Sequence, residues 1–127
     1  MQMSKDGLAR CHTLPRMVAF IKSVTFDCRE PLLVAAFWAD VLGSTVDEES
    51  TPERAWVEAA GWGGPSLWFV RVPESKSAKN RQHFDLRPLF TAPAEVERLV
   101  ALGASVVGRS GDRVLMTDPE GNEFCGA

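Results

Sequence analysis

The sequence predicts an α+β fold of two tandem βαβββ modules, which form a curled mixed sheet around a cleft with the helices outside. Three observations support this prediction. A short pattern occurs twice, as VTFDCR at residues 24–29 and QHFDLR at residues 82–87; each copy precedes an amphipathic stretch; and each stretch ends at a glycine, Gly43 or Gly103. A repeated supersecondary unit too small to bury its own core is expected to share one with its copy. At 127 residues, the chain has the length of one such domain.

The first module is expected at residues 17–73, after a flexible leader at residues 1–16. Residues 21–28 alternate as a strand does, and Pro31 is well placed to open a helix, because its missing N–H costs nothing there. Gly43 supplies the left-handed stop of this helix. The apolar stripe of the helix is predicted to contain Leu33, Ala36, Phe37 and Val41. Short strands are then expected at residues 45–48, 55–60 and 67–72.

The second module is expected at residues 81–127, after a polar, lysine-rich linker. Together the two modules make one domain at residues 17–127. A strand at residues 81–86 opens the second module, and a helix with the apolar stripe Val96, Leu99 and Val100 follows. Further strands are expected at residues 105–109, 113–117 and 123–125, with a turn at residues 118–122 before the last one.

Composition excludes several classes of function. A net charge of −3 and the absence of a basic stripe argue against nucleic-acid binding. No apolar run approaches the length of a membrane span, so no membrane contact is expected. The three cysteines are an odd number without a CxxC spacing, so they predict neither a disulfide framework nor a zinc site, and the expected location is the reducing cytoplasm.

His83 is the histidine placed to do chemistry. It shares a strand face with Arg81 and Asp85, so it is either an acid or base near neutral pH or a structural histidine held between the modules. Glu123 and Cys125 can meet His83 if the last strand adjoins it. Glu123 is then a candidate general base, and Cys125 is either a nucleophile activated by the imidazole or a small buried apolar residue.

Tryptophans and arginines are the candidates for ligand binding. The chain has four tryptophans and no tyrosine. Trp38 is expected in the core. Trp56, Trp62 and Trp68 either line an apolar pocket for a flat ligand, cover a sheet edge or a dimer contact, or pack in the ordinary way. Arg71 and Arg81 can anchor a carboxylate or phosphate of a ligand in bidentate fashion.

Four phrases of the chain resemble a known family. They are FWADVLG at residues 37–43, RVPE at 71–74, KNRQHFDL at 79–86 and DPEGNEFC at 118–125. Together they resemble the glyoxalase-like domain group of the vicinal-oxygen-chelate superfamily, which includes glyoxalase I, fosfomycin- and bleomycin-resistance proteins and extradiol dioxygenases. The resemblance implies paired βαβββ modules around a cleft, and in the metal-dependent members a divalent ion bound there by the first and last strands of both modules.

The ligand positions that the resemblance implies are mostly changed in this chain. His83 matches the family's histidine, but the equivalent position in the first module is Ser23 or Thr25, and the glutamate of the last strand is replaced by Cys125. Glu123 shares the face of Cys125 but lies out of register. Hydroxyl oxygens are unusual ligands for a catalytic divalent metal. We therefore expect no cofactor and no conventional metal site, and a divalent ion would need non-standard ligands.

The sequence thus leads to two functional hypotheses. The first is a glyoxalase-like enzyme of the lyase or isomerase type with a degenerate metal site, which acts on a small molecule with His83 and Glu123 as acid and base. The second is a non-enzymatic protein that binds or sequesters a small molecule, as the bleomycin-resistance relatives do. The exposed edges of such a sheet also suggest a homodimer.

Overall fold

The computed structural model describes residue 16 and residues 18–59, 62–88 and 92–126. The predicted leader therefore falls, apart from Arg16, outside the described residues. The elements in chain order are β1 (Ser23–Cys28), α2 (Pro31–Leu42), β2 (Arg54–Val57), β3 (Ser66–Arg71), β4 (Phe84–Asp85), α3 (Ala92–Leu102), β5 (Ser105–Ser110), β6 (Arg113–Thr117) and β7 (Glu123–Cys125). Neither of these two helices is long and apolar enough to cross a membrane.

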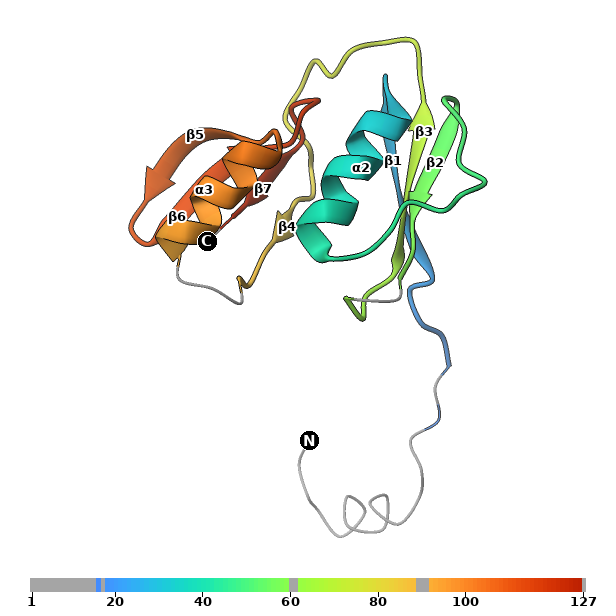
Figure 1. Cartoon of the computed structure of the whole chain (residues 1–127), viewed down its shortest axis with the longest axis horizontal. Helices are drawn as coiled ribbons and strands as arrows, with labels where there is room; N and C mark the ends of the chain where they lie inside the picture. Colours follow the sequence, from blue (N-terminus) through green and yellow to red (C-terminus); the bar gives the residue numbers. More distant parts are fainter. Residues whose placement is uncertain (1–15, 17, 60–61, 89–91, 127) are drawn as a thin grey trace, which may run out of the picture.

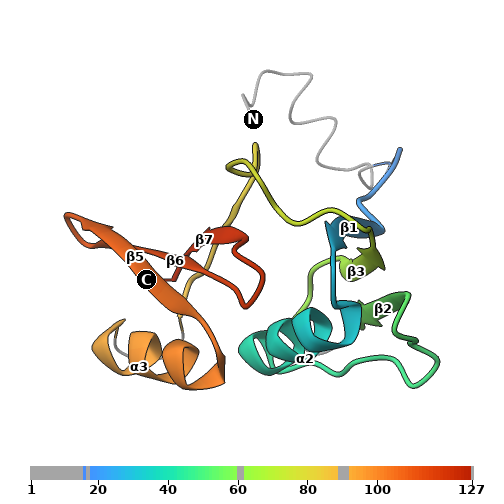
Figure 2. The same cartoon turned by 90° about the horizontal axis from the view of Figure 1, so that it is seen from above.

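The strands form two mixed sheets of the same topology, and the predicted α+β class is confirmed. The order is β1-β3-β2 in the first module and β4-β7-β6-β5 in the second, with β1 parallel to β3 and β4 parallel to β7. Hydrogen bonding is thus divided between two sheets, where the sequence prediction had one continuous sheet. The modules lie side by side, and both helices lie on the same side of the strands (Figures 1 and 2).

The strand predicted at residues 45–48 is reduced to a single bridge between Val46 and Val57. The chain turns directly after this bridge, because the Asp47 carboxylate accepts a hydrogen bond from the Glu49 backbone N–H at 2.8 Å. The bridge occupies the place that β5 has beside β6 in the second module. The repeat is therefore preserved in topology, although the first module lacks its fourth full strand.

Helix α2 has the predicted ends but not the predicted buried face. Pro31 stands in the first turn, and Gly43 ends the helix in the left-handed conformation with φ 67°. Leu33 is 50% exposed and Ala36 is also exposed, so their assignment to the apolar stripe was wrong. The buried residues of the helix are Pro31, Val34, Ala35, Phe37, Trp38, Ala39 and Val41. This wide arc follows from packing on two sides, since α2 covers its own sheet and also contacts the second module.

Helix α3 shows a similar difference at one position. Val96 and Leu99 are buried as predicted, whereas Val100 is 47% exposed, so its assignment to the stripe was wrong. Gly103 follows the helix at φ 126°, and its N–H donates to the Val100 carbonyl. Only one narrow face of α3 therefore meets the core.

The second module holds α2 at both ends and in its middle. Glu120 accepts hydrogen bonds from the backbone N–H groups of Arg29 and Glu30, at the start of the helix. Arg98 donates to the carbonyls of Asp40 and Val41 at the end of the helix, at 3.2 and 3.0 Å. These charges have the signs that the helix dipole favours at each end.

A hydrogen bond from Trp38 Nε1 to Asp118 Oδ2, at 3.0 Å, joins the middle of α2 to the turn before β7. Asp118 is buried, and it also accepts bonds from the backbone of Glu120 and from the backbone and side chain of Asn122. The Asp-Pro-Glu-Gly-Asn turn thus satisfies a buried carboxylate fully while it docks the helix.

One aromatic cluster continues the core across both modules. Trp38 packs edge-on against Phe84 and Phe124, with ring centroids 5.5 and 5.0 Å apart, and Phe26 contacts Phe84 at 5.4 Å. Trp38 is 3% exposed, which confirms its predicted place in the core. The two sheets therefore share a single core although no strand hydrogen-bonds between them in the described part of the chain.

Candidate functional site

A cavity of about 950 Å³ lies between the first strands of the two modules. Its lining comes from β1, from one residue of α2, from β4 and the segment that leads into it, and from the start of β7. Val24, Phe26, Trp38 and Phe84 give it an apolar wall, and its polar lining includes Asp27, Asn80, Arg81, His83, Asp85 and Glu123. A volume in this range with a few converging polar groups is typical of small-molecule sites.

The pairing of β4 with β7 decides which side chains of these two strands lie on the same face. These strands are parallel, with Phe84 opposite Phe124 and Asp85 opposite Cys125. Because side chains alternate along a strand, Phe84 and Phe124 point into the core together, and Asp85 and Cys125 share the other face. His83 lies two residues before Asp85 and therefore joins that face.

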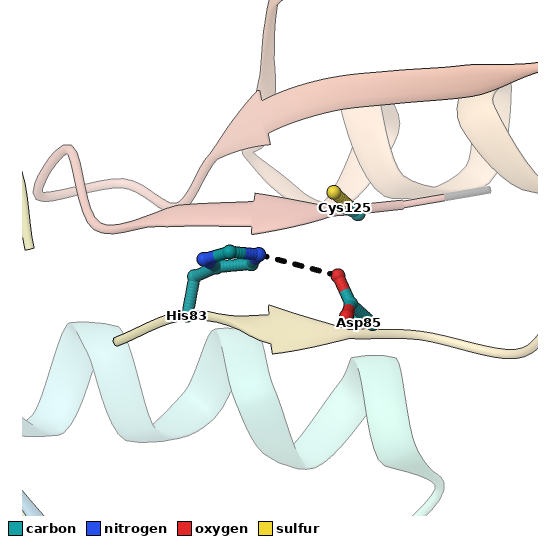
Figure 3. Close-up of side chains that lie close together, drawn as sticks. All are labelled: His83, Asp85 and Cys125. Atoms are coloured by element: carbon teal, nitrogen blue, oxygen red, sulfur yellow. Dashed lines mark ion pairs between the residues drawn. The ribbon is translucent and has the colours of Figure 1, made fainter. Parts of the chain in front are cut away.

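His83, Asp85 and Cys125 form a compact cluster (Figure 3). His83 Nε2 lies 3.4 Å from Asp85 Oδ1, and one ligand atom of each of the three residues lies within 4.8 Å of the others. The side chains of His83 and Asp85 are 40% and 65% exposed, whereas Cys125 is buried. The predicted meeting of His83 with the last strand thus takes place through Cys125.

Arg113 is a fourth member of this cluster that the sequence analysis did not select. Its Nη2 donates to Cys125 Sγ at 2.9 Å and to Asp85 Oδ1 at 3.2 Å. The hydrogen bond to Cys125 and the charges of Cys125 and Asp85 raise the pKa of the guanidinium above its usual value. A sequence signal existed, because Arg113 lies two residues before Leu115, which pairs with Cys125, and strand alternation places both on one face.

Glu123 lines the same cavity but is engaged by the segment between the modules. Lys76 Nζ lies 2.8 Å from Glu123 Oε2, and the Asn80 backbone N–H donates to Oε1 at 3.0 Å. Burial raises the pKa of Glu123, but the hydrogen bonds from Lys76 and Asn80 outweigh it, so the net shift is downward. Glu123 is therefore ionised and held near neutral pH, which lowers its strength as a base.

The other predicted ligand-binding residues lie in different places. Arg81 lines the cavity. Arg71 pairs with Glu53 at 3.7 Å, both side chains being largely exposed. Trp56 and Trp68 are opposite each other on β2 and β3 and stack at 4.3 Å, outside the described lining of the cavity. The predicted set is thus divided, and only part of it is gathered around His83.

The tryptophan pair lies on the face of the first sheet that turns away from α2. Its strand neighbours Ala55, Val57, Leu67 and Phe69 point the other way and are completely buried. The guanidinium of Arg54 lies 5.7 Å from the Trp68 ring, and Trp56 Nε1 donates to Glu58 at 3.1 Å. The two stacked rings are half-buried, and they lie at the surface of the sheet beside these polar neighbours.

The comparisons with known proteins agree with this architecture. Residues 23–126 match the family model described as a glyoxalase-like domain. No curated protein sequence matches the chain.

Several solved structures share the fold of this chain. A glyoxalase/bleomycin resistance protein/dioxygenase family enzyme from Burkholderia phytofirmans PsJN has a TM-score of 0.61 at 20% identity, covering 84% of this chain and 96% of that chain. The fosfomycin resistance protein FosX from Mesorhizobium loti has a TM-score of 0.55 at 13% identity, covering 88% and 90%. A glyoxalase-related enzyme from Fulvimarina pelagi has a TM-score of 0.59 at 17% identity, covering 86% of each chain.

The family model spans both modules, including the turn that docks α2 and the strands that carry His83 and Cys125. The fold predicted from the repeated pattern is the fold of these structures. The chain is therefore a member of the glyoxalase-like domain family.

Proposed function

We propose that this protein is an enzyme of the lyase or isomerase type that binds a small organic molecule in the cavity between β1 and β4. His83 is the group that moves a proton on the bound molecule. The observation that carries this proposal is the contact between His83 Nε2 and Asp85 Oδ1 at 3.4 Å, on the lining of the cavity.

The contact supports proton transfer in a direct way. The carboxylate of Asp85 lies beside Nε2 and fixes the orientation of the His83 ring on the cavity lining. Asp85 faces Nε2, so Nδ1 is the nitrogen left to exchange a proton with the substrate. With 40% of its side chain exposed, His83 is accessible to a molecule in the cavity.

The other cavity residues have supporting roles in this proposal. The rings of Phe26, Trp38 and Phe84 supply apolar contact area, and Arg81 can pair with an anionic group of the substrate. Glu123, predicted from the sequence as a second acid or base, is bound by Lys76 and Asn80, so we assign it first to holding these two residues in place beside β7. Its part in proton transfer stays a prediction.

A second candidate is a protein that binds and sequesters a small molecule without reaction. The aromatic wall of the cavity supports it, because binding of an apolar ligand needs only that wall. The name of one similar structure also includes the bleomycin-resistance type of protein.

Exchange of carbon-bound protons for deuterium tests the first candidate without a known product. A panel of small α-hydroxy and α-keto carbonyl compounds in D₂O, followed by proton NMR, reports any proton abstraction. We expect His83→Gln to reduce exchange of an accepted compound about 100-fold or more, the usual size of general acid–base catalysis. His12→Gln, which changes the other histidine of the chain, is the matched control and is expected to retain exchange.

Binding of the same compound separates the two candidates. If His83→Gln binds it as tightly as the unchanged protein does but exchanges no protons, the enzyme proposal holds. If the unchanged protein binds compounds of the panel and exchanges the protons of none, the protein is a binder. Equal exchange by His83→Gln and the unchanged protein would exclude His83 as the acid–base group.

A further inference from the structure

The cluster of His83, Asp85 and Cys125 has the donor chemistry of a site for a thiophilic divalent cation. An imidazole nitrogen, a carboxylate oxygen and a sulfur lie within 4.8 Å of one another. Zinc prefers these three donor types, and catalytic zinc sites use three protein ligands with water in the fourth position. The cluster also lies where the family resemblance places one histidine ligand and one ligand of the last strand.

The positively charged guanidinium of Arg113 already contacts this cluster of donor atoms. Its Nη2 lies 2.9 Å from Cys125 Sγ and 3.2 Å from Asp85 Oδ1, so it contacts two of the three donors. A metal ion bound to the same two atoms would lie about 2.0 to 2.3 Å from each of them, and it would overlap this nitrogen. The two cations would also repel each other at this distance. The residues therefore do not fit a metal ion while Arg113 keeps its place.

We propose that the guanidinium of Arg113 is the resident cation of the His83–Asp85–Cys125 cluster, and that its removal converts the cluster into a binding site for zinc or a similar divalent ion. Nη2 neutralises Asp85 and binds Cys125 in the way a metal would. The side chain of Arg113 is 57% exposed, so it can be removed without opening the core. The inference does not depend on the proposed reaction, because it concerns ion binding alone.

Cobalt is a suitable probe, because Co²⁺ replaces zinc in such sites and gives visible and thiolate charge-transfer absorption. The full-length chain is titrated with Co²⁺, with a phosphine reductant present. We expect Arg113→Ala to bind Co²⁺ at least about tenfold more tightly than the unchanged protein and to develop the thiolate band. Arg109→Ala, which removes another exposed arginine one strand away, is expected to behave like the unchanged protein.

A second variant assigns the signal to the cluster. Arg113→Ala combined with Cys125→Ala is expected to lose the charge-transfer band, and circular dichroism of each variant shows whether it is folded. Equal affinity of Arg113→Ala and the unchanged protein would overturn the proposal, whether both bind or neither does. A thiolate band that persists in the double variant would also overturn it, since the band would then come from another cysteine.

Discussion

Cys28 and Cys125 are both buried, but only Cys125 makes a hydrogen bond with a guanidinium group among the described residues. Burial, followed by the carboxylates of Glu120 and Asp118, raises the pKa of the Cys28 thiol to about 12. Cys125 instead lies beside the guanidinium of Arg113. Cys28 is therefore an inert, neutral thiol at physiological pH.

The raised pKa of Cys28 predicts how stability depends on pH. The folded state keeps this thiol protonated above the ordinary thiol pKa of 9.0, whereas the unfolded state releases the proton. The contribution of Cys28 is thus complete below about pH 9 and is lost as the pH rises towards 12. We expect the stability difference between the unchanged protein and Cys28→Ala to shrink by about 1.4 kcal/mol from about pH 8 to about pH 10.

Urea unfolding followed by tryptophan fluorescence, with a phosphine reductant present, measures this difference. Val34→Ala removes a completely buried side chain without a titrating group, so its cost should not change over the same pH range. If the stability difference between the unchanged protein and Cys28→Ala also stays constant over this pH range, the fold does not hold the Cys28 thiol neutral.

The alternation of side chains along a strand predicted which residues of the candidate site share a face. It did not predict which residues of other segments contact them, because these contacts depend on long side chains from other strands and from the linker. The sequence placed Arg81, His83 and Asp85 on one face, and all three line the cavity. It did not select Arg113, because the contact crosses from β6 past β7 to β4 and depends on which strands are neighbours. Strand alternation predicted the face on which Glu123 lies, but it could not predict the ion pair with Lys76. Lys76 lies in the segment between the modules, where no regular alternation fixes the position of a side chain.

At the scale of the elements, α2 depends on residues that are distant in the sequence. Its N-cap residue, Glu30, makes no side-chain capping hydrogen bond. Glu120 of the second module supplies this function, with its Oε1 2.7 Å from the Arg29 backbone nitrogen. Arg98, whose pKa is raised by its hydrogen bond to buried Glu95, supplies the positive charge at the other end.

This arrangement predicts that Glu120 acts as a helix cap supplied from the other module. We expect Glu120→Ala to lower the free energy of unfolding by about 1 to 2 kcal/mol, the upper range for loss of a cap. Part of the loss should disappear at high salt, because the interaction with the helix dipole is screened. Urea unfolding at low and high salt measures both effects.

Glu97 on α3 offers the matched control, because it is an exposed glutamate of the same module. Glu97→Ala should change the free energy of unfolding by no more than about 0.5 kcal/mol. Equal small effects of the two substitutions would mean that the contacts of Glu120 with the backbone do not stabilise α2.

Local sequence signals predicted an element well where it packs against one surface, and poorly where it packs against two. Strands β6 and β7 have the predicted bounds, because their alternation and the turn between them are local properties. The buried face of α2 was predicted from a single stripe, but the helix packs on its sheet and on the second module, so Val34 is buried and Leu33 is not. Which second surface a helix meets is a property of the whole chain.

At the scale of the whole molecule, the two modules are joined by packing and not by a shared sheet. Rings from β1, α2, β4 and β7 meet in one cluster, and the hydrogen bonds of Asp118, Glu120 and Arg98 cross the same boundary. Since neither module buries its apolar surface alone, the modules are expected to unfold together.

The tryptophans allow a direct test of this cooperativity, because all four lie in the first module. Leu99 lies in α3 of the second module and is completely buried. We expect Leu99→Ala to destabilise the protein by about 2 to 5 kcal/mol. If the core is shared, tryptophan fluorescence, which reports the first module, should shift to lower urea by the same amount as far-ultraviolet circular dichroism, which reports both.

Val100→Ala serves as the control. Val100 is the next residue of the same helix and is 47% exposed, so this substitution should leave both transitions nearly unchanged. A fluorescence transition that stays in place while part of the dichroism transition moves would show that the first module unfolds independently. The aromatic cluster and the capping contacts would then be too weak to couple the modules. The cavity between β1 and β4 would in that case depend on two bodies with separate stabilities, and loss of α3 packing would open it without unfolding β1.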